Sequence, residues 1–236
     1  VTMGYALIYS IMNLGIAAEH AISPLIRDYT RGLQGSHDNP AGGIIGVYVF
    51  IIAVTAVMLV AHLLIFTKKV EQTQRVVVPP DEDDDDRSIL EKLKSLPIMD
   101  VRFIFFIFIL LPVRTLFAHQ WMTVPFYTMR CFDESVGERY EWVAMINPIV
   151  IVIGVPLLAA LTRNVSIITM MIIGTFISAL STLLLLPEPN IYLLLTYVVV
   201  FSIGEAAWSS RFLEYVAGLA PPGQVGAYMG VATLPW

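Results

Sequence analysis

Glu205 is the residue whose type and position in this chain most strongly suggest chemistry. It follows fourteen apolar or weakly polar residues that begin at Ile191, which at about 1.5 Å per residue places it roughly 20 Å along a helix. An ionised carboxylate at that depth is destabilised unless it is paired or hydrated, so such a group suits proton exchange or the binding of an ammonium group. The alternative is that the helix reaches water near Ser209 and that Glu205 lies close to its end.

Arg114 is a second charged residue inside an apolar stretch, eleven residues past Phe103. Arginine stays charged at any accessible pH, so it needs a carboxylate, backbone carbonyls or water around it. Glu205 and Glu19 are the candidate carboxylates. Arg114 is therefore a candidate for binding a substrate carboxylate or for a gating pair. The alternative is a structural ion pair that holds helices together.

Other polar side chains accompany these two. His119 and Gln120 follow Arg114 within two turns and give that stretch an amphipathic character. A histidine titrates near neutral pH, although hydrogen-bonded packing near a helix end is the alternative for His119. Glu19, next to His20, lies in or at the end of the first apolar stretch and is a further candidate site residue.

Asn147 stands at the start of a proline-interrupted stretch. Asn147-Pro148 and Pro156 fall in one apolar segment, with the two prolines eight residues apart and so on nearly one helix face. Each proline removes an intrahelical hydrogen bond and exposes a carbonyl. Transporters use such broken helices to hold substrate, and an amide suits a peptide- or carboxylate-like group. The alternative is that Asn147 caps its own kink.

The elements that must position these residues are long apolar segments. Crossing a hydrocarbon core of about 30 Å takes roughly 20 helical residues, and each segment must satisfy its own backbone groups. Six segments reach this length, and a seventh begins at Val225. The sequence therefore predicts an all-α, polytopic membrane protein with spans at Val1–Ile26, Gly42–Thr67, Phe103–Pro125, Val143–Thr162, Val165–Leu186 and Ile191–Ser209.

Composition agrees with a membrane protein and excludes other classes. The chain is 57% hydrophobic and 14% charged, with a mean hydropathy of +0.74, whereas soluble domains carry about a quarter charged residues. There is no basic field for nucleic acid. The lone Cys131 supplies neither a disulfide nor a metal cluster. No motif of a soluble enzyme is present, so we expect neither an enzyme nor a bound cofactor or metal.

One connection differs from the short turns between the other spans. Residues 68–100 are polar, hold six of the nineteen acidic residues in the run Asp81–Asp86, and end in Ser88–Leu96, whose spacing predicts a short amphipathic surface helix. We predict two spans of an N-terminal bundle at 1–67, this linker at 68–100, and four spans plus the start of a fifth at 101–236. Because both ends fall inside apolar segments, we expect a fragment of a longer protein whose other helices complete the bundle.

Positive charge sets the expected orientation. Loops facing the cytoplasm carry an excess of Lys and Arg. The side of the long linker has nine such residues and the other side has four, so the linker is predicted to be cytoplasmic. The nine are Lys68, Lys69, Arg75, Arg87, Lys92, Lys94, Arg102, Arg163 and Arg211; the four are Arg27, Arg31, Arg130 and Arg139.

Three stretches resemble a known family. Asn147–Leu157 is similar, without a gap, to the N-P-x-x-I-x-I-x-x-P-L pattern of the eighth helix in proton-dependent oligopeptide transporters, a branch of the major facilitator superfamily. Residues 204–230, from Gly204-Glu205 through Pro221-Pro222 to Gly230, resemble that branch's tenth helix and the loop that follows. Tyr9–Gly15 resembles its fifth helix. Ser210 and Phe212 depart from the pattern, which usually has Pro and Gly there.

The resemblance implies a twelve-helix carrier of two six-helix bundles that works by alternating access and is driven by protons. The chain would run from the fifth helix to the start of the eleventh. In the family, the Glu of the tenth helix and the Asn of the eighth contact the substrate, and these roles pass to Glu205 and Asn147.

The predicted function is therefore proton-coupled secondary transport of small organic solutes, with peptides as one class. The expected site residues are Glu205, Asn147, Arg114, Gln120, His119 and Glu19. The expected partners are a small-molecule substrate, protons and the lipid bilayer. The alternatives are a seven-helix membrane receptor, because the span count reaches seven, and a membrane protein without transport activity.

Overall fold

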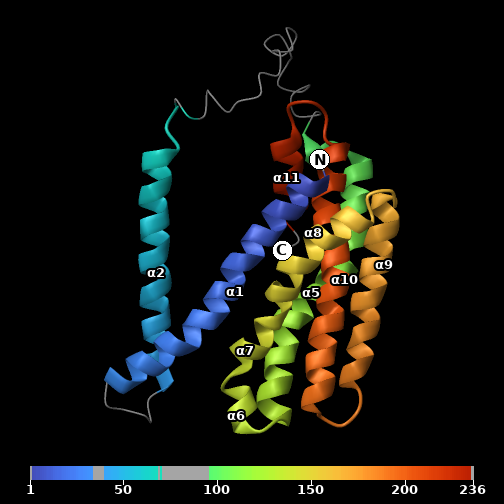
Figure 1. The fold of residues 1–236 in the computed structure, drawn as a ribbon. Coiled ribbons are helices and arrows are strands. Elements are labelled where there is room, and N and C mark those ends of the chain that lie inside the picture. Colours follow the sequence, from blue (N-terminus) through green and yellow to red (C-terminus); the bar gives the residue numbers. More distant parts are fainter. Residues whose placement is uncertain (1, 34–39, 69, 71–95, 235–236) are drawn as a thin grey trace. The chain divides into compact units, whose positions relative to one another are not determined.

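The computed structural model describes residues 2–33, 40–68, 70 and 96–234, and every element within them is helical (Figure 1). The linker's acid run and its predicted amphipathic helix at Ser88–Leu96 lie outside these residues, except for Leu96 itself. The contacts group the chain into two compact units: residues 1–18 with 81–236, and residues 19–80. The division at 1–67, 68–100 and 101–236 stays a prediction.

The first unit contains the beginning of α1 (Thr2–Leu33) and the helices after the linker. In chain order these are η1 (Pro97–Met99), α5 (Val101–Cys131), α6 (Glu134–Gly137), α7 (Tyr140–Ala144), α8 (Ile146–Leu161), α9 (Ile167–Ser181), η2 (Thr182–Leu185), α10 (Ile191–Leu219) and α11 (Val225–Ala232).

Side-chain caps mark where the long helices of this unit begin. Asp100 accepts hydrogen bonds from the first backbone N–H groups of α5, Ser166 does so for α9, and Asn190 for α10. Such caps satisfy N–H groups that have no partner inside the helix. These three helices therefore begin at polar caps and are mostly apolar beyond them.

Five described helical segments are long and apolar enough to cross a membrane, which confirms the predicted polytopic helical protein. The five are Gly43–Ile65, Val101–Cys131, Tyr140–Leu161, Ile167–Leu185 and Ile191–Leu219. They correspond to the predicted spans from the second to the sixth. The predicted first span coincides with the start of α1, which is 32 residues long and carries polar side chains throughout.

The sixth predicted span is longer than expected. We expected it to end near Ser209, but α10 continues to Leu219, and Ser209, Ser210 and Arg211 are all buried. Glu205 therefore lies in the middle of a long helix, and the alternative that it sits near a helix end is wrong. The polar residues that suggested an end instead face neighbouring helices.

The predicted fourth span is interrupted where the prolines indicated. The chain forms α7, breaks at Met145 and resumes as α8. Pro148 has no N–H to donate to the carbonyl of Ala144, four residues earlier, which accounts for the break. Pro156 is accommodated inside α8. Asn147 therefore begins the second part of a broken span.

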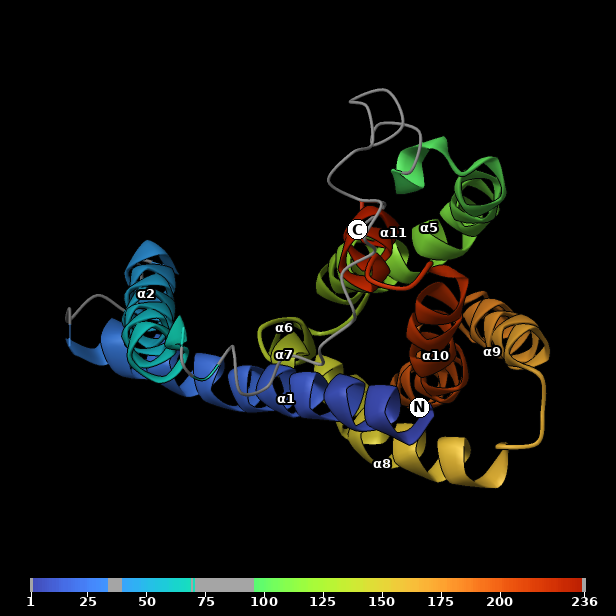
Figure 2. The same cartoon turned by 90° about the horizontal axis from the view of Figure 1, so that it is seen from above.

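In the first unit, α10 packs between α8 and α9 (Figure 2). Glycines allow the close approach of α9 and α10, because a Cβ placed on Gly174 would lie 2.6 Å from the carbonyl oxygen of Gly204. On the other side, Ala6 of α1, Ala159 of α8 and Ala206 of α10 belong to one buried cluster. Small residues thus bring α1 and α8 close to the face of α10 next to Glu205.

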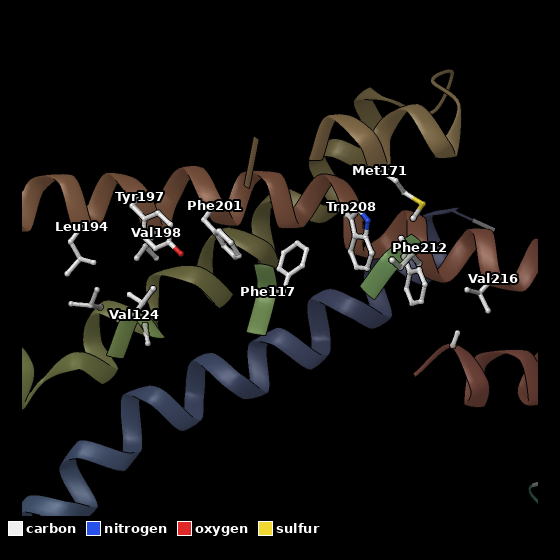
Figure 3. Packing of buried hydrophobic residues seen from close by; sticks show 14 of the residues in the cluster. Phe117, Val124, Met171, Leu194, Tyr197, Val198, Phe201, Trp208, Phe212 and Val216 are labelled. Atoms are coloured by element: carbon white, nitrogen blue, oxygen red, sulfur yellow. The ribbon is translucent and has the colours of Figure 1, made fainter. Parts of the chain in front are cut away.

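Aromatic rings fill the space between α5 and α10 (Figure 3). The ring centroid of Phe117 lies 5.2 Å from that of Phe201 and 5.4 Å from that of Trp208. Trp208 in turn stacks on Phe212 at 5.0 Å. These distances are typical of favourable aromatic pairs, and the rings fix the rotation of α5 against α10.

The second unit consists of the end of α1, from Glu19, and α2 (Pro40–Ile65). Gly43 and Gly46 lie where the two helices meet: a Cβ on Gly43 would come within 2.7 Å of Arg27 Cγ, and one on Gly46 would clash with Thr30. The hydroxyl of Thr30 also lies 3.4 Å from the carbonyl oxygen of Gly43, to which it donates. These two glycines therefore permit the close contact of α1 and α2.

Candidate functional site

Glu205 is 6% exposed, and both of its carboxylate oxygens accept hydrogen bonds from other helices. The hydroxyl of Tyr9 on α1 donates to Oε1 at 2.9 Å. The amide Nδ2 of Asn147 on α8 donates to Oε2 at 2.8 Å. The structure thus brings Glu205 and Asn147, the two residues to which the family resemblance gave substrate contacts, into direct contact. It adds Tyr9 as a third member from α1.

The nitrogen and the oxygen of the Asn147 side-chain amide differ in their hydrogen bonding. It is 1% exposed, and Nδ2 also donates to the hydroxyl of Ser202 at 3.0 Å. Among the described residues its carbonyl oxygen, Oδ1, is buried without a hydrogen-bond partner. A buried acceptor left unpaired costs about 1–3 kcal/mol. Asn147 Oδ1 therefore favours the arrival of a donor, and the adjacent carboxylate favours a positively charged one.

Local structure explains why Asn147 reaches α10. The span breaks at Met145, so Asn147 lies in the first turn of α8, beside Pro148. The hydroxyl of Ser202 donates to the carbonyl of Val198 at 2.5 Å and accepts from Asn147, which orients the amide toward Glu205. The alternative that Asn147 caps its own kink is not the arrangement observed.

Arg114 is 5% exposed and projects from α5 onto the aromatic face of α10. Its guanidinium carbon lies 4.9 Å from the ring centroid of Trp208 and 4.7 Å from that of Phe212. Cation–π contacts of this kind are strengthened when the partners are desolvated. Trp208 lies three residues after Glu205, so the two side chains are neighbours on the surface of α10. The structure therefore places Arg114 in the neighbourhood of Glu205.

Gln120 belongs to a different polar cluster. It is 1% exposed, and its Oε1 accepts from the hydroxyl of Tyr197 on α10 at 2.6 Å. Tyr197 precedes Glu205 by eight residues, about 12 Å along the helix axis. Gln120 thus ties α5 to α10 about two turns from Glu205, and its predicted role in substrate binding stays a prediction.

Neither His119 nor Glu19 is one of the buried polar residues of the first unit, to which Glu205 belongs. His119 is exposed, and its Nδ1 lies 2.6 Å from the hydroxyl of Thr123 one turn later. Glu19 belongs to the second unit, where it accepts from Ser23 at 2.6 Å and lies 3.0 Å from His20 Nδ1. These local contacts favour the hydrogen-bonding alternative for His119.

Tyr9 and Arg211 are the polar residues that the sequence reasoning did not assign to a site. Tyr9 lies one turn before Asn13, whose amide donates to the carbonyl of Tyr9 at 2.9 Å. This polar face of α1, inside the stretch similar to the family's fifth helix, was the available signal. Arg211 was counted only as a charge near a helix end.

Arg211 instead forms a buried cluster at the end of α10 beyond Glu205. Its Nη1 lies 2.9 Å from Glu214 Oε2, and its Nη2 donates to the carbonyl oxygen of Thr162 after α8 at 2.9 Å. The hydroxyl of Thr2 on α1 donates to Glu214 as well. The same three helices that meet at Glu205 therefore meet again at this end.

Two cavities flank the indole of Trp208. One, of about 310 Å³, lies between α1, α10 and α11 and is lined by Tyr9, Ser209 and mostly apolar side chains. The other, of about 330 Å³, lies between α5, α9 and α10 and is lined almost entirely by apolar side chains, among them Phe106 and Met171. Only the first of these two shares a residue, Tyr9, with the hydrogen-bonded Glu205 cluster.

These features define a class: a multi-pass integral membrane protein whose helices enclose a buried carboxylate, an amide and a guanidinium. The chain belongs to the Major Facilitator Superfamily, whose family model matches residues 1–235. It is accordingly a membrane transporter, which favours the predicted carrier over a seven-helix receptor. No curated protein and no solved structure matched the chain.

Proposed function

We propose that the protein is a proton-coupled secondary active transporter of small organic solutes, with peptides as one class, working by alternating access. The observation that carries the proposal is the burial of Glu205 between Tyr9 and Asn147 at the meeting of α1, α8 and α10. A carboxylate held by donors from other helices can exchange them for a proton or for a cationic group. Either exchange changes the contacts between helices.

Glu205 takes the role of proton or substrate-ammonium site. Asn147 contributes a hydrogen bond to the solute through its unpaired Oδ1. Arg114, held over Trp208 and Phe212, binds a solute carboxylate or pairs with Glu205 during gating. The branch of oligopeptide transporters, suggested by the stretches around Tyr9, Asn147 and Glu205, supports this division of roles.

The proposed orientation places the linker at 68–100 on the cytoplasmic side. It is supported by the excess of Lys and Arg there, nine residues against four. In this orientation the cluster of Arg211, Glu214 and Thr2 lies at the cytoplasmic end of α10. A solute released from Glu205 to the cytoplasm would pass this cluster.

The test is uptake by the full-length protein in proteoliposomes, with and without an inward proton gradient. A solute panel that includes dipeptides identifies a transported compound. Glu205→Gln is expected to abolish gradient-driven uptake while the amount of inserted protein stays the same. The matched control is Glu188→Gln, the same change at an exposed residue between η2 and α10, which is expected to leave uptake intact.

Solute exchange without a gradient separates the two roles of Glu205. If Glu205 carries the proton, exchange of labelled for unlabelled solute persists in Glu205→Gln. If Glu205 binds the solute's ammonium, exchange is lost as well. Gradient-driven uptake that survives in Glu205→Gln at the wild-type rate would show the proposal to be wrong.

A further inference from the structure

Two arginines lie where the end of α1 meets the start of α2 (Figure 1). Arg27 and Arg31 are one turn apart on α1, and both side chains pack over Gly43 of α2. A Cβ at Gly43 would lie 2.7 Å from Arg27 Cγ and 2.9 Å from both Cγ and Nε of Arg31. The absence of a side chain at Gly43 therefore leaves the space that both arginine stems occupy.

Two lengths place this arginine pair at the membrane surface. The segment of α2 that is long and apolar enough to cross a membrane begins at Gly43 itself, so stems packed on Gly43 lie at the level of the lipid headgroups. α1 has 32 residues, about 48 Å of helix, whereas a hydrocarbon core is about 30 Å thick. Its end therefore has the length to pass beyond the core, and the predicted first span stops at Ile26, just before Arg27.

The charge at this end of α1 favours an anion. The segment from Pro24 to Leu33 carries two arginines and one acid, the exposed Asp28, so it keeps a net positive charge. Both arginines are partly buried. Among the described residues, Nε of Arg31 is buried without a hydrogen-bond partner, which is unfavourable for a charged donor. An anion that binds the rest of the guanidinium offsets that loss.

The side of the membrane makes the pair unusual. In the proposed orientation the pair lies opposite the linker, on the side where the chain has four basic residues against nine, and Arg27 and Arg31 are two of those four. Basic residues there run against the usual bias toward the cytoplasm. Two of them packed at one point therefore indicate binding rather than orientation.

The surface beside the pair suits acyl chains. None of the most apolar stretch of α2 is buried within the described part of the chain. Ile44, Ile45 and Tyr48, within two turns of Gly43, are 48%, 55% and 62% exposed. The guanidinium fork of an arginine matches the oxygens of a phosphate. A phospholipid can therefore place its phosphate against both arginines and its chains along α2.

We propose that the ends of α1 and α2 form a binding site for an anionic phospholipid, whose phosphate is held by Arg27 and Arg31 over Gly43. The occupant is a lipid rather than a free phosphate ion, because the paired charges adjoin exposed apolar surface at the level of the headgroups. A net negative headgroup is favoured over a zwitterionic one, because choline would bring another cation to a site that already holds two. The inference does not depend on the transported solute.

The experiment measures lipid binding to the full-length protein in detergent by native mass spectrometry. The probes are dioleoylphosphatidylglycerol and dioleoylphosphatidylcholine, which share the phosphate and both chains and differ in headgroup charge. One arginine near an anionic lipid surface is worth about fivefold in binding, so the pair should favour the phosphatidylglycerol by roughly 25-fold. Arg27→Gln/Arg31→Gln should lose most of this preference.

Two comparisons separate a built site from charge alone. Arg130→Gln/Arg139→Gln removes two charges from exposed residues on the same predicted side of the membrane, so it should keep the preference. Gly43→Ala keeps both arginines but fills the space of their stems, so it should weaken binding of the phosphatidylglycerol. Its matched control is Gly32→Ala at the end of α1, where a Cβ meets no atom within 4 Å, and this variant should bind like the wild type.

The inference is overturned if the wild type binds the two lipids equally, if the preference survives in Arg27→Gln/Arg31→Gln, or if Arg130→Gln/Arg139→Gln loses it to the same extent. If the Arg27 and Arg31 double variant does not fold, Gly43→Ala decides the question in its place. An excess of inorganic phosphate should not displace the phosphatidylglycerol, and displacement would show that a free anion is the ligand. Failure of any of these tests leaves the proposed function standing, because none of them measures uptake.

Discussion

A methyl group at Gly204 is expected to force α9 and α10 apart next to Glu205. An ideal Cβ at Gly204 would lie 2.6 Å from the carbonyl oxygen of Gly174 and 2.6 Å from the backbone nitrogen of Ser178. Both are backbone atoms of α9, so neither can rotate away, and the helices themselves must shift. Overpacking of this kind typically costs about 1–3 kcal/mol.

The expected loss of thermal stability follows from that cost. A chain of this size shifts its melting temperature by about 2–4 °C for each kcal/mol, so Gly204→Ala should melt roughly 2–12 °C below the wild type. Differential scanning fluorimetry in detergent measures the shift. Because Gly204 precedes Glu205, solute uptake should fall in the same variant.

Gly218→Ala is the matched control because it makes the same change in the same helix. A Cβ at Gly218 meets no atom within 4 Å, so the alanine should stabilise the protein by about 0.4–1 kcal/mol through its effect on the unfolded chain. The reasoning fails if Gly204→Ala melts at or above the temperature of Gly218→Ala. That result would mean that α9 and α10 do not approach each other at Gly174 and Gly204.

Two further predictions concern the ends of the helices. Arg211→Ala should lower the free energy of unfolding by about 1–3 kcal/mol, because it removes the buried arginine that donates to two partly buried acceptors, the Glu214 carboxylate and the Thr162 carbonyl oxygen. Thermal melting against the exposed control Arg163→Ala checks this, and equal melting of the two variants would contradict it. Hydrogen bonds from the backbone N–H of Phe103 and from the hydroxyl of Tyr228 keep the pKa of Asp100 below its ordinary value. This carboxylate should therefore stabilise the fold at any pH above about 3.9 and lose its effect as the pH falls through the lower pKa of the folded state. Asp100→Ala should cost about 0.5–2 kcal/mol at neutral pH, and a difference from the wild type that does not shrink in acid would count against this assignment.

Local signals were enough to predict the helices and the depth of the buried acid. A run of apolar residues long enough to cross a bilayer is visible without any tertiary information, and so is the break at Pro148. The predicted end of α10 at Ser209 was wrong, because serines and an arginine are typical of helix ends that reach water. Here Ser209 lines the space beside Tyr9 of α1, and Arg211 donates to Thr162 after α8. Hydropathy does not encode burial among neighbouring helices.

The partners of Glu205 depended on tertiary structure. Tyr9 lies 196 residues away in the chain, and nothing in its own segment shows that it meets α10. The position of a residue along an apolar segment also does not tell which face of the helix the residue occupies. His119 and Gln120 are neighbours, yet His119 is exposed and Gln120 is buried, because successive residues point about 100° apart around a helix.

The hydrogen bonds at Glu205 argue for a site that changes its occupant rather than for a structural link. Tyr9 and Asn147 both donate to the carboxylate, so a proton arriving at either oxygen would meet a donor and need an acceptor instead. Asn147 can supply that acceptor, because its Oδ1 has no hydrogen-bond partner in the described part of the chain. If the Asn147 side-chain amide turned over, Oδ1 would accept a hydrogen bond from a protonated Glu205, but Nδ2 would no longer donate from α8. If the Tyr9 hydroxyl rotated to accept from Glu205, its donation from α1 would likewise be lost. Each change of occupant would therefore change how α1 and α8 are held to α10, which is what a carrier requires of its binding site.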